Sequence, residues 1–141
     1  KKNSSSSILE NWKSPKTIRP WGYYRELYEG VDFKVKELVI NPLSKLSMQR
    51  HQFRSETWNI VSGKVSMGLI DMNRGIQHTQ QIFSTFEIPV FTWHQGMNLT
   101  DNPAHIVEIW RGDSGQLSEK DIERIDSDSI QKLLSQRIRP D

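Results

Sequence analysis

The sequence predicts an all-β fold organised as one small barrel. Short β-prone segments recur at regular intervals, and Gly, Asn, Asp or Pro bounds each of them. Residues 33–40 approximate the alternation of a half-buried strand, and Asn41 and Pro42 end it. At 141 residues the chain is long enough for one domain with a core. Many short strands are typical of a sandwich or barrel. The predicted strands are 33–40, 44–50, 56–62, 64–71, 78–83, 85–88 and 106–111.

The two ends of the chain differ from this strand-rich middle. Residues 1–18 begin with a stretch rich in Lys, Asn and Ser, which predicts a mobile arm. Residues 19–126 are assigned to the barrel, and residues 127–141 to a helical tail. From Ser118 to Ile138 the apolar residues recur at helical spacing, and Ser118 and Asp121 could cap a first turn. One or two short helices are therefore expected there.

Composition excludes several classes of function. The 19 basic and 17 acidic residues are interspersed and leave a net charge of +2, so no nucleic-acid partner is expected. No apolar run reaches the roughly 18–20 residues that a membrane-spanning helix needs, and no signal peptide is apparent, so a cytoplasmic protein is expected. Because the chain has no cysteine, any metal must be held by nitrogen and oxygen ligands.

Two segments carry candidate metal ligands. Gln49 and His51 stand two residues apart, so in a strand they project from the same face, and Glu56 follows a short turn. His94 comes about forty residues later, after Pro89. Two imidazoles, a carboxylate and an amide oxygen suit a divalent metal, with zinc the leading candidate and Mn, Co, Ni or Fe as alternatives. Gln49 is the weakest of the four ligands, because its amide could equally bond to neighbouring backbone.

The spacing of these residues resembles the two cupin motifs. The first motif is matched by Gln49, His51, Glu56 and Gly63, and the second by Pro89, His94 and Asn98. More narrowly, three stretches look like the type II mannose-6-phosphate isomerase domain; they are 19–22, 46–58 and 119–124. The resemblance implies a cupin, which is a double-stranded β-helix or jelly-roll-like barrel. It also implies interconversion of mannose 6-phosphate and fructose 6-phosphate on a metal, with Glu56 part of the catalytic site.

Some positions depart from the pattern of this family. Gln52, Phe53 and Thr57 stand where the family often has histidine, and Leu43 and Phe91 replace two motif glycines. A cupin that binds a sugar or sugar nucleotide without catalysis therefore stays open. A metal-dependent cupin of other chemistry, such as a dioxygenase or an epimerase, is a further alternative.

Several basic residues are candidates for holding the phosphate of a sugar phosphate. Arg50 and Arg54 flank the predicted metal site, although strand alternation could also turn both toward solvent. Arg111, at the end of a predicted strand, and Lys64, after Gly63, are further candidates. A homodimer is expected, because pairing would hide the exposed edge strands of a barrel.

Overall fold

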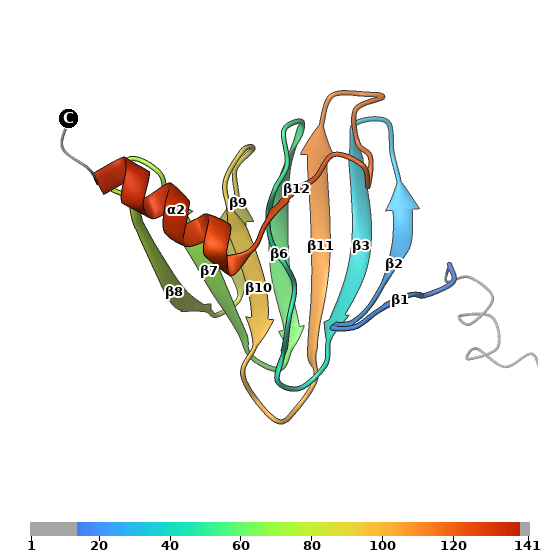
Figure 1. Ribbon diagram of the computed structural model, residues 1–141. Helices are drawn as coiled ribbons and strands as arrows, with labels where there is room; N and C mark the ends of the chain where they lie inside the picture. Colours follow the sequence, from blue (N-terminus) through green and yellow to red (C-terminus); the bar gives the residue numbers. More distant parts are fainter. Residues whose placement is uncertain (1–13, 139–141) are drawn as a thin grey trace, which may run out of the picture.

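The computed structural model describes residues 14–138, which form two antiparallel sheets facing each other (Figure 1). The first sheet has the strand order β1-β2-β3-β11-β6-β9, and the second has the order β12-β5-β10-β7-β8, with β4 paired to β10. The strands of the first sheet are β1 Thr17–Arg19, β2 Gly22–Glu29, β3 Phe33–Ile40, β6 Arg54–Ser62, β9 Thr85–Ile88 and β11 Ala104–Gly112. Those of the second are β4 Ser44–Lys45, β5 Met48–Arg50, β7 Val65–Asp71, β8 Ile76–Ile82, β10 His94–Asn98 and β12 Glu123–Ile125.

The predicted strands are confirmed, with small changes at their ends. Strands β3 and β9 have the predicted bounds, while residues 44–50 divide into β4 and β5. Four further strands, β1, β2, β10 and β12, lie outside the predicted segments. Of the predicted N-terminal arm, residues 1–13 lie outside the described residues, and Thr17 and Ile18 already belong to β1.

The space between the sheets is filled by apolar side chains, as the alternation of the strands requires. Trp58 lies near the centre of this core and is 2% exposed. Gly96 on β10 faces it, and a Cβ at Gly96 would come within 2.5 Å of the Trp58 ring. The glycine therefore allows the two sheets to approach closely beside the segment that carries His94. The other core residues are Leu38, Ile40, Leu46, Val65, Met67, Ile82, Ile88, Ala104 and Ile106.

The prediction that a helix begins near Ser118 is wrong. Residues 123–125 instead form β12, which pairs with β5 and places Arg124 opposite Gln49. Asp121 does not cap a helix; its carboxylate accepts the backbone N–H groups of Gln52 and Phe53 at 2.9 and 2.8 Å. The free edge of β5 offers backbone partners that outweigh the helical spacing of the apolar residues.

The single helix of the described chain, α2, spans Ser127–Ile138 and begins where the helical tail was predicted. Asp126 caps it, since its Oδ1 accepts the backbone N–H of Ser129 at 2.8 Å. Ile130 packs against Met48, Ile70 and Trp93 and so attaches the helix to the outer side of the second sheet (Figure 1). No helix in residues 14–138 is long and apolar enough to cross a membrane.

Candidate metal centre and cavity

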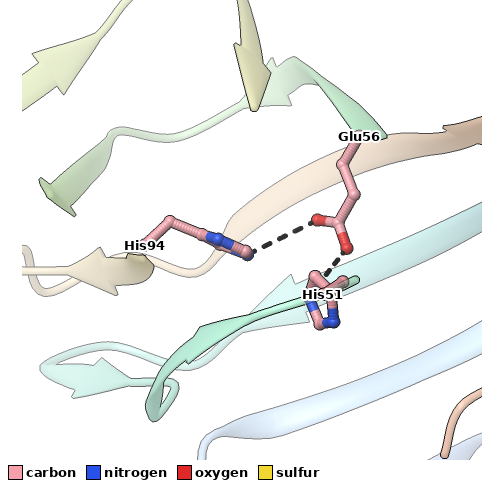
Figure 2. Close-up of side chains that lie close together, drawn as sticks. All are labelled: His51, Glu56 and His94. Atoms are coloured by element: carbon pink, nitrogen blue, oxygen red, sulfur yellow. Dashed lines mark ion pairs between the residues drawn. The ribbon is translucent and has the colours of Figure 1, made fainter. Parts of the chain in front are cut away.

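The connection from β5 to β6 and the start of β10 bring three of the predicted ligands together. Strands β5 and β6 do not form a hairpin, because β5 pairs with β10 and β12 in the second sheet while β6 pairs with β11 and β9 in the first. His51 follows β5, Glu56 lies on β6, and His94 is the first residue of β10, opposite Gln49 on β5. Figure 2 shows the side chains of His51, Glu56 and His94 converging from these separate segments. Each is only 2% exposed. The second cupin-like segment thus reaches the first because β5 and β10 are neighbours in the sheet.

The three side chains present their ligand atoms to a common point. His51 Nε2 lies 3.1 Å from Glu56 Oε2, and His94 Nε2 lies 3.7 Å from Glu56 Oε1. One ligand atom from each residue falls within 4.8 Å of the others. Two imidazole nitrogens and one carboxylate form a donor set typical of catalytic zinc and related divalent metals, which keep further positions open for water or substrate.

Backbone carbonyls fix the orientation of both imidazoles. His51 Nδ1 donates to the carbonyl of Asp121 at 2.7 Å, and His94 Nδ1 donates to that of Thr92 at 2.8 Å. A carbonyl can only accept, so Nδ1 of each ring carries a proton. A neutral ring then has its lone pair on Nε2, facing Glu56, whereas a protonated His51 donates its Nε2–H to that carboxylate. Metal-binding histidines are commonly held in this way. The residues therefore fit a divalent cation.

Arg54 lies against the same cluster, on the same face of β6 as Glu56 and Trp58. Its Nε donates to Glu56 Oε2 at 2.8 Å, and its Nη2 is 3.2 Å from His51 Nε2. The guanidinium also lies 3.4 Å from the centroid of the Trp110 ring. Arg54 thus supplies a permanent positive charge to the buried carboxylate, and its bonds use atoms that a metal would also use.

Two buried carboxyl groups share one indole donor. Trp58 Nε1 donates to Glu56 Oε1 at 2.9 Å and to Glu108 Oε2 at 3.0 Å. Burial alone would raise the pKa of Glu56, but the hydrogen bonds with His51 and Glu108 and the charges of His94 and Arg54 hold that pKa well below its ordinary value. Burial, followed by the charge of Glu56, raises the pKa of Glu108 well above its ordinary value. The pair is therefore divided into one ionised and one protonated acid.

His94 is neutral for a related reason. Burial lowers the pKa of its imidazole, although the charge of Glu56 acts in the opposite direction. A neutral imidazole keeps its lone pair available at neutral pH, as metal binding requires.

A cavity of about 340 Å³ opens beside the cluster. Glu56 belongs both to the cluster and to the cavity wall, and Gln49 also lines the wall. Aromatic side chains from Trp21, Tyr24, Trp58 and Trp110 form much of the rest. The charged residues around it are Arg19, Lys36, Arg54, Glu56, Glu108, Glu119 and Arg124. A small ligand in this cavity would contact both the carboxylate of Glu56 and several cations.

Gln49 and Arg50, the other predicted site residues of this segment, make contacts outside the cluster. Gln49 turns its amide nitrogen toward Ser47, which accepts through its carbonyl and its hydroxyl, both at 3.3 Å. Arg50 pairs with Glu123 at 2.6 Å and packs over Phe91 and Trp93.

The structure does not bring Arg50, Arg111 or Lys64 to the cavity. Arg111 alternates with Trp110 on β11, so the tryptophan faces the interior and the arginine is exposed, with its Nη1 donating to Thr57 Oγ1 at 2.7 Å. Lys64 is exposed in the turn between β6 and β7. Among the predicted phosphate-binding candidates, only Arg54 faces inward and lines the cavity.

Strand alternation could have identified cavity residues that the sequence analysis missed. Lys36 shares the face of Leu38 and Ile40 on β3 and is 3% exposed. Glu108 alternates in the same way between Ile106 and Trp110 on β11. A charged residue at a core-facing position of a strand is the signal that was available for both. Nothing in the local sequence, however, indicates that Arg19 and Arg124 reach the same cavity.

Two facing antiparallel sheets with a buried His-Glu-His cluster between them define a cupin. The solved structures agree. The capsular polysaccharide assembling protein CapF from Staphylococcus aureus superposes with a TM-score of 0.67 at 18% identity, covering 79% of this chain and 34% of that one. A cupin-2 domain protein from Rhodospirillum rubrum, Rru_A2000, gives 0.61 at 13% identity, covering 80% and 71%. At these identities the likeness shows the fold.

Within the cupins, the chain belongs to the family described as mannose-6-phosphate isomerase C-terminal, whose model matches residues 9–127. AlgA, an alginate biosynthesis protein of Pseudomonas aeruginosa, is 33% identical over 108 residues, which are 77% of this chain and 21% of that protein. Mannose-1-phosphate guanylyltransferase 2 of Escherichia coli O157:H7 is 31% identical over 107 residues, which are 76% and 21%. The chain thus spans about a fifth of the length of these relatives.

Proposed function

We propose that this cupin is a metal-dependent sugar phosphate isomerase that interconverts mannose 6-phosphate and fructose 6-phosphate. The observation that carries the proposal is the pair of imidazoles fixed through Nδ1, with both Nε2 atoms facing Glu56 beside a cavity lined by cations. Membership of the mannose-6-phosphate isomerase C-terminal family supports the choice of substrate.

In this proposal His51, Glu56 and His94 hold the metal, and Gln49 on the adjacent strand is the fourth ligand. When bound, a divalent metal polarises the oxygens on C1 and C2 of the open-chain sugar. Zinc is the first candidate, and Mn, Co, Ni and Fe suit the same donors. The protein itself supplies the fixed ligand geometry and a cavity with aromatic walls.

The isomerisation also needs a group that moves a proton between C1 and C2. Gln52 and Phe53, which stand where the family often has histidine, are exposed, and neither lines the cavity beside the cluster. Besides Glu56, the carboxyl groups on the wall of this cavity are Glu108 and Glu119. Because the raised pKa of Glu108 keeps this carboxyl protonated, Glu119 is the wall carboxylate that could accept a proton in place of the missing histidines.

The size of the cavity favours a sugar monophosphate over a sugar nucleotide. Its volume of about 340 Å³ lies at the lower end of the range of roughly 300–1,000 Å³ that small-molecule sites occupy. The partner is accordingly a small sugar phosphate. We further propose a homodimer, because β1, β9, β12 and β8 are edge strands of the two sheets; light scattering of the purified protein measures this directly.

The activity is tested with protein loaded separately with Zn, Mn, Co and Ni. Conversion of mannose 6-phosphate and incorporation of solvent deuterium at C2 are followed together. We expect metal-dependent turnover that is lost in His51→Ala and in His94→Ala. The matched control is His78→Ala, because His78 is exposed on β8 and lies outside the cluster. Folded, metal-loaded protein that exchanges no deuterium with any of the four metals would contradict the proposal.

A second candidate function is a sugar-binding cupin that works without a metal. The contacts of Arg54 favour it, because this guanidinium already supplies a cation to Glu56 and His51. The two functions differ in one measurement. Binding of mannose 6-phosphate that is unaffected by chelators, together with no deuterium exchange, would select the binding protein.

A further inference from the structure

Two arginines from opposite ends of the chain line the same cavity without a carboxylate partner. Arg19 lies on β1 and Arg124 on β12. Within residues 14–138, no carboxylate oxygen lies within 4.0 Å of either guanidinium. Arg19 Nη1 donates to the carbonyl of Ile18 at 3.1 Å, and Arg124 Nε donates to Ser47 Oγ at 3.2 Å. Each of them therefore keeps donors free for a ligand, because a guanidinium carries five N–H groups.

The other cations of the cavity are already neutralised. Arg54 is paired with Glu56 at 2.8 Å, and Lys36 is paired with Glu119. Lys36 also packs between two rings, 3.9 Å from the centroid of Tyr24 and 4.3 Å from that of Trp110. These contacts fix the inner cations in place. The charge that remains to be balanced by a ligand thus belongs to Arg19 and Arg124.

The surroundings of the two arginines hold them at the cavity. Arg19 lies 5.4 Å from the centroid of the Tyr24 ring, which also contacts Lys36. Arg124 stands opposite Gln49 in the pairing of β12 with β5, next to the segment that carries His51. Arg19 and Arg124 are both exposed residues, so their guanidinium groups line the opening of the cavity. Lys36 and Glu56 are buried and lie deep inside it.

We propose that Arg19 and Arg124 form the subsite that binds the phosphate group of the substrate. Guanidinium groups bind phosphate oxygens with paired, charge-assisted hydrogen bonds, and two of them match the double negative charge of a phosphate monoester. The sugar would then extend inward toward Glu56. The identity of the sugar rests on the proposed function, whereas the binding of a phosphate monoester does not.

The proposal also gives β12 a role. By pairing with β5, this strand brings Arg124 to the cavity, which a helix starting near Ser118 would not do. The first and last of the three stretches that resemble the isomerase family, 19–22 and 119–124, thus both contribute to one cavity. They are about a hundred residues apart in the sequence.

The experiment is a calorimetric titration of the full chain with mannose 6-phosphate, mannose 1-phosphate, inorganic phosphate and unphosphorylated mannose, with and without metal. The variants are Arg19→Gln, Arg124→Gln and the double variant, and the matched control is Arg74→Gln, because Arg74 is exposed in the turn between β7 and β8. Since a hydrogen bond to a charged group contributes about 1.5–3 kcal/mol, each single variant is expected to weaken mannose 6-phosphate binding about tenfold or more. Arg74→Gln should leave it unchanged.

The outcomes separate this subsite from the isomerase activity. Wild-type affinity in the double variant, or no binding of any phosphate compound by the wild type, would overturn the subsite. An equal loss in Arg74→Gln would overturn it too, because the effect would then come from net charge. Binding that depends on Arg19 and Arg124, without any isomerisation, would support the subsite and end the isomerase proposal. Undiminished turnover of mannose 6-phosphate in the double variant would support the isomerase proposal and overturn the phosphate subsite.

Discussion

The buried cluster of His51, Glu56 and His94 and the opening of the cavity are neighbouring regions built in different ways. His51 and Glu56 are five residues apart in the sequence, on the segment that crosses from β5 in the second sheet to β6 in the first, and both are buried. Arg19 and Arg124 come from strands at opposite ends of the chain and are exposed. The buried cluster can therefore be recognised in the sequence from a short motif. The residues at the opening of the cavity cannot, because distant segments of the chain come together there only in the fold.

The largest expected effect concerns the buried cluster. Replacing Glu56 by leucine leaves the guanidinium of Arg54 buried without its carboxylate, and breaking a buried pair costs roughly 3–5 kcal/mol of folding free energy. At the opening, Arg124→Gln should change the free energy of unfolding by about 0.5 kcal/mol or less. Urea denaturation of the metal-free proteins measures both. Equal destabilisation by the two substitutions would break the comparison.

An exposed ion pair provides the control for this first prediction. Arg50 and Glu123 are 2.6 Å apart, and the side chain of Glu123 is 56% exposed. Glu123→Gln should cost less than about 1 kcal/mol, because solvent screens exposed pairs. A loss as large as that of Glu56→Leu would mean that burial does not explain the difference.

The next prediction concerns pH. The pKa of Glu108 is raised in the folded protein, so the folded state keeps a proton that the unfolded chain releases as the pH rises through about 4.3. The stability that this carboxyl contributes is therefore fully present below the unfolded pKa and is lost as the pH rises toward the folded pKa. Glu108→Gln removes this loss. The melting temperature of the variant minus that of the wild type should therefore increase as the pH is raised from 4 to 8.

Melting curves at several pH values test this directly. Glutamine can still accept the hydrogen bond from Trp58 Nε1, so the comparison isolates the ionisation. Glu87→Gln, on the exposed side of β9, is the matched control and should give a profile parallel to that of the wild type. If the melting temperature of Glu108→Gln also followed the wild type in parallel across this pH range, the pKa of Glu108 would not be raised in the folded protein.

The smallest expected effect comes from two residues with left-handed backbone. Leu43 and Phe91 have φ angles of 56° and 59°, a conformation that costs residues other than glycine roughly 1–2 kcal/mol. Leu43 is 70% exposed, so Leu43→Gly should stabilise the fold by about 0.5–1 kcal/mol once the flexibility of glycine is deducted. Phe91→Gly should gain less, because Phe91 packs against Arg50 at 3.9 Å. Thermal unfolding ranks the two, and a loss of stability in Leu43→Gly would contradict the account.

Sequence reasoning predicted the fold and the centre of the site because both depend on short-range patterns. The short spacing of His51 and Glu56 keeps them close in space, although β5 and β6 belong to different sheets rather than to one hairpin. The alternation of residues 33–40 gives β3 its observed bounds. The two family glycine positions, Leu43 and Phe91, do adopt the backbone that glycine favours. That departure from the family pattern is therefore absorbed locally, without a change of fold.

The rest depended on contacts between distant segments. The residues around Ile122 and Ile125 have helical spacing, and only the free edge of β5 explains why Glu123–Ile125 forms a strand instead. Arg111 was expected near the phosphate, but its neighbour Trp110 takes the inward position on β11. Lys36 could have been predicted from its alternation with Leu38, whereas the meeting of β1 and β12 at one cavity could not.

The most direct test of the central claim is titration of the metal-free protein with Co²⁺, followed by its visible absorption. The account predicts one equivalent bound, with absorption bands that show nitrogen and oxygen ligands in a site of low coordination number. His51→Ala and His94→Ala should abolish these bands, and His78→Ala should keep them. Saturation with no bands in the wild type, or identical bands in His51→Ala and His94→Ala, would contradict the assignment of His51, Glu56 and His94 as a metal centre.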